Sequence, residues 1–163
     1  MEINREYKFR GKYQNGYNYS DGDGWIYGSL LYKDSEYAIV RTEDIDFGNS
    51  CDDGYSNISD FTCIPVIKET VGQYIGKSIN KKHPMFDDKI YLYEGDIIAD
   101  NEGRFPTKYV ITFKDYKFVG ISDKGDDYGK YVFDFSQPYK MTKELKLLGN
   151  IHDNPELLIN NRK

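Results

Sequence analysis

Short runs of β-branched and aromatic residues, each bounded by turn-forming residues, constrain the fold of this chain most strongly. Four runs show this pattern most clearly: residues 37–42 (YAIVRT), 108–113 (KYVITF), 117–122 (KFVGIS) and 130–135 (KYVFDF). Their length and composition are typical of β-strands. No stretch long enough for an ordinary helix combines an apolar period of 3.6 with a capping residue. The sequence therefore predicts an all-β fold.

Two of these runs also predict which side chains face the core. Side chains alternate between the two faces of a strand, so every second residue shares a face. The residues predicted to face the core are Tyr109, Ile111 and Phe113 in one run and Tyr131, Phe133 and Phe135 in the other. Residues 122–129 (SDKGDDYG) are dense in turn-forming residues and predict a β-hairpin with a solvent-exposed tip.

Helical structure is expected only as short turns, near residues 137–145 (QPYKMTKEL) and 154–158 (NPELL). In the second, Pro155 suits the first helical position and Asn154 its cap. We interpret residues 47–61 as a polar loop and residues 76–89, which contain Pro84, as a long loop near a subdomain boundary. The expected organisation is an irregular β subdomain with long polar loops over residues 1–88 and a second subdomain over residues 89–163.

Charge and composition narrow the classes of function. The formal net charge is -5, so the chain lacks the overall positive charge that drives most binding to phosphate backbones. No apolar run approaches the length of a membrane-spanning helix, and the first residues lack the apolar core of a secretory signal, which favours a cytosolic protein. In the cytosol, Cys51 and Cys63 are expected to be free thiols.

Motifs for metals and cofactors are weak, and we expect none to be bound. Residues 19–25 (YSDGDGW) resemble the start of a calcium loop, but Tyr19 and Leu30 would then occupy ligand positions, so a turn is favoured. The histidines and cysteines lack the close spacing of a zinc site, and Asp52 and Asp53 would raise the pKa of the Cys51 thiol. The glycines of residues 71–76 (VGQYIG) lack the third glycine of a phosphate-binding loop.

The carboxylates of Glu94 and Asp96 are the candidate catalytic residues. They lie in residues 93–100 (YEGDIIAD), and in a regular strand they would share one face, as the paired acids of a glycosidase must. Gly95 between them favours a bend, where an aspartate at a strand entrance satisfies neighbouring backbone donors. The structural interpretation is therefore preferred to the catalytic one.

Five blocks of the sequence resemble, in order, the successive signatures of the YopX-like proteins of bacteriophages and prophages. The blocks are residues 5–13 (REYKFRGKY), 25–30 (WIYGSL), 69–76 (ETVGQYIG), 90–98 (IYLYEGDII) and 147–158 (LLGNIHDNPELL). The resemblance implies a small, nearly all-β protein with an irregular amino-terminal β unit and a carboxy-terminal SH3-like barrel. No enzymatic activity and no catalytic residues are established for the family, so the resemblance identifies a lineage and not a mechanism. It places residues 93–100 at the entry of that barrel.

The chain departs from the family pattern at two places. Lys77–Leu92 separates blocks that a short turn usually joins, and Ile75 replaces a small residue. A function of the usual short hairpin is therefore not transferred to this chain.

Three functions follow as hypotheses. The first is a non-enzymatic phage or prophage accessory protein of the host cytoplasm that binds another protein, or a second copy of itself, through some of its 16 tyrosines. The alternative is weak nucleic-acid binding through stacked tyrosines and local lysines. The third is a hydrolase that uses Glu94 and Asp96, which would need a pocket and a carboxylate of raised pKa.

Overall fold

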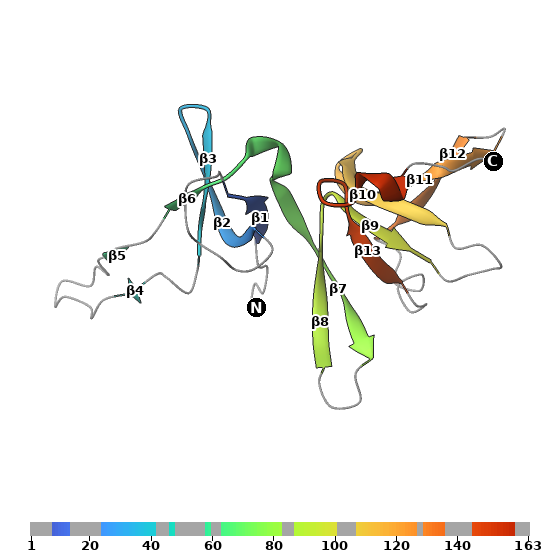
Figure 1. The fold of residues 1–163 in the computed structure, drawn as a ribbon, viewed down its shortest axis with the longest axis horizontal. Coiled ribbons are helices and arrows are strands. Elements are labelled where there is room, and N and C mark those ends of the chain that lie inside the picture. Colours follow the sequence, from blue (N-terminus) through green and yellow to red (C-terminus); the bar gives the residue numbers. More distant parts are fainter. Residues whose placement is uncertain are drawn as a thin grey trace. The chain divides into compact units, whose positions relative to one another are not determined.

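The computed structural model describes residues 8–13, 24–41, 46–47, 58–59, 63–82, 87–100, 107–126, 129–135 and 145–158. The chain divides into two compact units, Met1–Tyr74 and Ile75–Lys163. Within the described residues, regular structure consists of β-strands and two 3-10 turns, which confirms the predicted all-β fold (Figure 1). None of the helical segments in this part of the chain is long and apolar enough to cross a membrane.

The amino-terminal unit is an antiparallel sheet with the strand order β6-β3-β2-β1. On its other side, β1 pairs with the first residues of β7. Its strands are β1 (Phe9–Lys12), β2 (Trp25–Lys33), β3 (Glu36–Val40), β6 (Cys63–Pro65) and the first residues of β7 (Gly72–Lys82). Two further short strands, β4 (Asp46–Phe47) and β5 (Ile58–Ser59), pair with each other at the ends of the predicted loop over residues 47–61. The rest of that loop lies outside the described residues.

Alternating side chains of these strands form the core of this unit. Its fully enclosed members are Ile26, Ile39, Ile64 and Val66. A bridge between Tyr13 and Val66 also joins the end of β1 to the segment after β6. The 3-10 turn η2 (Lys68–Thr70) interrupts the pairing along β1, and there the Thr70 hydroxyl accepts the Lys12 N–H at 2.8 Å. A side chain therefore satisfies the backbone donor where the ladder is broken.

The carboxy-terminal unit is built on a five-stranded antiparallel sheet with the order β12-β11-β10-β9-β13. Its elements are β8 (Asp87–Tyr93), β9 (Asp96–Ala99), β10 (Lys108–Lys114), β11 (Lys117–Asp126), β12 (Gly129–Asp134), β13 (Lys146–Asn150) and the 3-10 turn η4 (Pro155–Leu158). The described strands form an open sheet that is compatible with the expected SH3-like arrangement but does not close into a barrel. Strand β9 lies between β10 and β13 and is buried along its whole length.

The predicted hairpin over residues 122–129 is confirmed. Strands β11 and β12 pair with each other, and Gly125 lies opposite Lys130, with an irregularity in register between Ile121 and Gly125. The tip itself lies outside the described residues, as does nearly all of the predicted helical turn at residues 137–145. The turn predicted at residues 154–158 is confirmed as η4, which begins at Pro155.

The predicted core face is confirmed in part. Tyr109, Ile111 and Phe135 are buried in the core of the carboxy-terminal unit. The prediction for Phe113 is wrong, since 53% of this residue is exposed. It is the penultimate residue of β10, beyond the part of the sheet that other side chains cover, and its ring instead meets Phe118 edge to face. Side chains at positions 131 and 133 lie outside the description.

The interpretation of residues 76–89 as a long loop is wrong. Strand β7 continues to Lys82, β8 begins at Asp87, and the two strands are neighbours in one sheet. Polar composition suggested a loop, but Ile75 and Ile79 share one face of β7 and pack against the core of the carboxy-terminal unit. Backbone pairing together with these two apolar side chains accounts for a strand that has few other apolar residues.

Candidate functional site

The turn between β8 and β9 holds the two candidate carboxylates. Gly95 has a φ of +85°, a left-handed conformation that glycine adopts without steric cost. Asp96 is 1% exposed, and its Oδ2 atom accepts the Tyr93 N–H at 2.8 Å. The aspartate therefore closes the turn that introduces its own strand, as the sequence predicts.

The same turn is bound to the neighbouring strand β10. The Gly95 N–H donates to the Ile111 carbonyl at 2.8 Å, and Glu94 Oε1 accepts the Phe113 N–H at 3.2 Å. Glu94 thus contacts β10, whereas the Asp96 carboxylate reaches back to β8. Each carboxylate accepts a hydrogen bond from a backbone N–H group. In this geometry both carboxylates act as structural hydrogen-bond acceptors.

The loop after β13 meets this turn from the other side. Asn150 lies opposite Asp96 in the sheet, and the Ile151 N–H donates to the Gly95 carbonyl at 2.9 Å. The side chain of Asn150 organises this loop: its Oδ1 accepts the N–H groups of His152 and Asp153, each at 2.9 Å, and its Nδ2 donates to Asp153 Oδ2 at 2.8 Å. The imidazole of His152 also lies near Gly95.

Turn η4 is tied to the sheet beyond this loop. The Asn154 carbonyl accepts the Leu157 N–H at 3.1 Å, while Asn154 Oδ1 accepts the Asn150 N–H at 3.3 Å. At the other end of the turn, Lys108 Nζ donates to the Leu157 carbonyl at 2.8 Å. The segment from Asn150 to Leu158 is therefore an integral part of the carboxy-terminal unit.

The polar side chains in these turns form hydrogen bonds that hold the backbone in place. Among the described residues, no three histidine, cysteine or acidic side chains are grouped so that they could hold a metal ion. Cys63 is an exposed free thiol on β6. Cys51 and His83, the other soft ligands considered with it and His152, lie outside the described residues.

Comparison with protein-family models decides the relationship of this chain. Residues 8–159 match the model described as YopX protein, which covers nearly the whole chain. The chain belongs to the YopX family. A search of curated proteins gave no significant match. In this YopX-family protein, the blocks YEGDI and GNIHDNPELL, far apart in sequence, meet at the turn around Gly95.

Removing the Asp96 carboxylate is expected to lower stability. In Asp96→Ala the buried Tyr93 N–H loses its acceptor, which costs about 1 to 3 kcal/mol in the free energy of unfolding. Asp96→Asn keeps an acceptor oxygen and should cost less. Urea denaturation measures both, with Glu156→Ala, at an exposed position of η4, as a control. If Asp96→Ala kept the stability of the wild type but lost a catalytic activity of the protein, the catalytic interpretation would be favoured instead.

Two hairpins end in exposed aromatic residues that the sequence did not single out. Residues 32–37 (YKDSEY) and 113–118 (FKDYKF) each form a two-residue turn with both central residues at positive φ. In each, the aromatic residues at the two ends face one another, with ring centroids 4.9 Å apart for Tyr32 and Tyr37 and 5.1 Å apart for Phe113 and Phe118. The shared pattern of an aromatic residue, lysine and aspartate was the signal available in the sequence.

Proposed function

We propose that this protein is a non-enzymatic protein-binding module, an accessory protein encoded by a phage or prophage that acts in the host cytoplasm. Its partner is a second copy of the chain or another host or phage protein. The observation that carries this proposal is the exposure of aromatic side chains at the two hairpin ends. Tyr32 is 63% exposed, and Tyr116 is 97% exposed. Tyrosine is enriched in protein interfaces because it offers a large, rigid contact area.

The conformation of Tyr116 supports a contact with another molecule. It has a φ of +62° in the turn between β10 and β11. This left-handed conformation costs a bulky side chain about 1 kcal/mol relative to glycine or asparagine. Because the ring is almost fully exposed, packing within its own unit does not offset this cost. Unfavourable backbone conformations of this kind are concentrated at functional sites.

The position of a basic and aromatic cluster in the amino-terminal unit argues against nucleic-acid binding. Arg10 and Lys12 lie over the Trp25 ring, at 4.7 Å and 5.4 Å from its centroid. Arg10 is only 6% exposed and Trp25 only 3% exposed, so the indole is not accessible for stacking on a base. These two cations pack against the tryptophan ring. The net charge of -5 further opposes the binding of phosphate groups.

Site-specific crosslinking tests the proposal. We expect p-benzoylphenylalanine at position 32 or 116 to crosslink to a protein in lysate of the source bacterium or to a second copy of the chain. The same group at the exposed Lys146 should not crosslink. Light scattering reports the oligomeric mass, and fluorescence anisotropy reports binding to single- and double-stranded oligonucleotides at about 150 mM salt. A monomer without crosslinks that binds an oligonucleotide at submicromolar affinity would reject the proposal in favour of nucleic-acid binding.

A further inference from the structure

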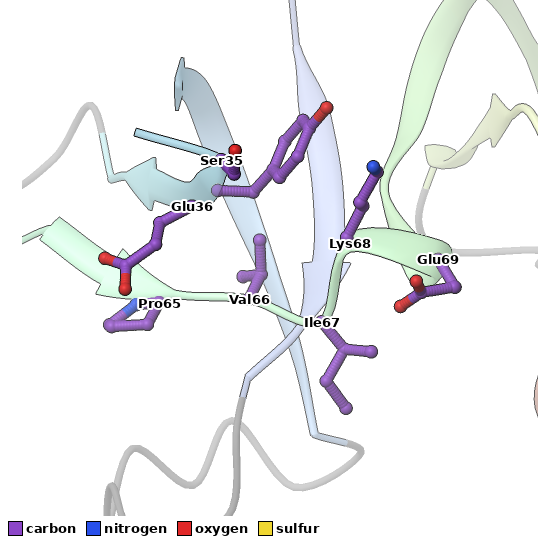
Figure 2. Close-up of a pocket in the computed structure, with 8 residues that line it drawn as sticks. Ser35, Glu36, Pro65, Val66, Ile67, Lys68 and Glu69 are labelled. Carbon is purple, nitrogen blue, oxygen red and sulfur yellow. The ribbon is translucent and has the colours of Figure 1, made fainter. Parts of the chain in front are cut away.

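The amino-terminal unit contains a pocket of about 420 Å³ where the β2–β3 hairpin meets the segment that follows β6. It is lined by residues 35–37 of the hairpin and residues 65–69 (Figure 2). The Tyr37 ring is held in place by Tyr32 across the hairpin, and Pro65 and Ile67 contribute apolar surface. The pocket therefore joins directly to the exposed aromatic end of this hairpin.

Charge is distributed unevenly in this pocket. The carboxylates of Glu36 and Glu69 lie on opposite sides, with Val66 between them (Figure 2). Both glutamates are exposed, and within the described part of the chain neither forms an ion pair. The ammonium of Lys68 lies 5.7 Å from the centroid of the Tyr37 ring, which places it over the ring. The two carboxylates thus remain available to pair with a cationic side chain of another molecule. They lie beside the Tyr37 ring, which already has the Lys68 ammonium over its face.

We infer that this pocket binds an extended segment of a protein partner that carries basic side chains. Two arginines or lysines of the segment pair with Glu36 and Glu69, and the residues between them lie against Tyr37, Pro65 and Ile67. Arginine suits these positions because its guanidinium forms charge-assisted hydrogen bonds with a carboxylate and its stem packs on apolar surface. The inference rests on the proposed function and adds the chemistry of the partner.

A matched pair of short peptides tests the charge requirement. The probe is acetyl-Arg-Pro-Arg-amide, and its control replaces both arginines with citrulline, which has nearly the same shape but no charge. Titration into the full chain, followed by two-dimensional NMR, should give saturable shifts of the amide signals of residues 35–37 and 66–69. The citrulline peptide should bind about tenfold more weakly or not at all, because it lacks the charge-assisted hydrogen bonds.

Two double variants separate the pocket from the overall charge of the protein. Glu36→Gln/Glu69→Gln should abolish the shifts, whereas Asp115→Asn/Glu156→Gln makes the same change in net charge at exposed positions of the other unit and should retain them. Thermal melting checks that both variants fold. Absent shifts, shifts that map elsewhere, equal binding of the citrulline peptide or unchanged binding by the pocket variant would each overturn the inference. Crosslinking at position 32 or 116 without arginine-peptide binding would leave the proposed function intact and reject only this inference.

Discussion

Replacing Gly28 with alanine is expected to unfold the amino-terminal unit. A Cβ atom at this position of β2 would lie far inside the van der Waals contact distance to the Val40 carbonyl oxygen on β3. Because the obstacle is backbone, a change of rotamer cannot relieve it, and the two strands must separate locally. We expect a loss of about 3 kcal/mol or more in the free energy of unfolding.

Tryptophan fluorescence provides the measurement. Trp25 is the single tryptophan of the chain and is buried on the same strand as Gly28. Gly24→Ala is the matched control: Gly24 has a φ of +79°, but an added Cβ would make only an ordinary contact at 3.8 Å with Tyr13. That variant should lose only about 1 kcal/mol, from backbone strain. Equal denaturation midpoints for the two variants would show that the approach of β2 to β3 does not limit stability.

Removing β13 is expected to unfold the carboxy-terminal unit. A chain that ends at Leu145 loses the strand that pairs with Ile97, Ile98 and Ala99 on one side of β9. It also loses Ile151, whose N–H binds the Gly95 carbonyl. Without β13, the buried strand β9 has one edge with no hydrogen-bonding partner. We expect this loss to exceed about 5 kcal/mol, which is the free energy of unfolding of a marginally stable domain.

Two-dimensional NMR of the truncated chain measures this effect. We expect the dispersed amide signals of residues 87–100 and 107–126 to collapse, while Trp25 retains its native fluorescence because it belongs to the other unit. A chain that ends at Leu158 keeps every described contact of η4 and β13 and serves as the control. Cooperative melting and native amide shifts of residues 96–99 in the shorter chain would contradict the expectation.

The candidate site could be predicted only in part. Gly95 and Asp96 stand next to each other in a strand entrance, so their roles as bend and backbone acceptor followed from local sequence. Glu94 accepts its hydrogen bond from the N–H group of Phe113, which lies on another strand. The loop organised by Asn150 comes from the carboxy-terminal part of the chain. No local pattern specifies such partners, because they depend on which strands pair.

The exposed aromatic residues show the same limit. Tyr109, Ile111 and Phe113 follow a single alternation, and the sequence assigned all three to the core. Only the folded unit reveals that its core ends before Phe113. Likewise, residues 35–37 and 65–69 form a pocket because β6 pairs with β3, which the intervening sequence does not disclose.

The sequence by itself determined the all-β class, the positions of β3, β10, β11 and β12, the β11–β12 hairpin and the turn at Pro155, because these depend on local alternation and on residues that favour turns. Tertiary structure alone decided that the polar residues 76–82 form a strand, that Phe113 is exposed and that Glu94 and Asn150 support one turn. These outcomes depend on pairing between distant segments and on where the core ends, and both are set by the whole fold.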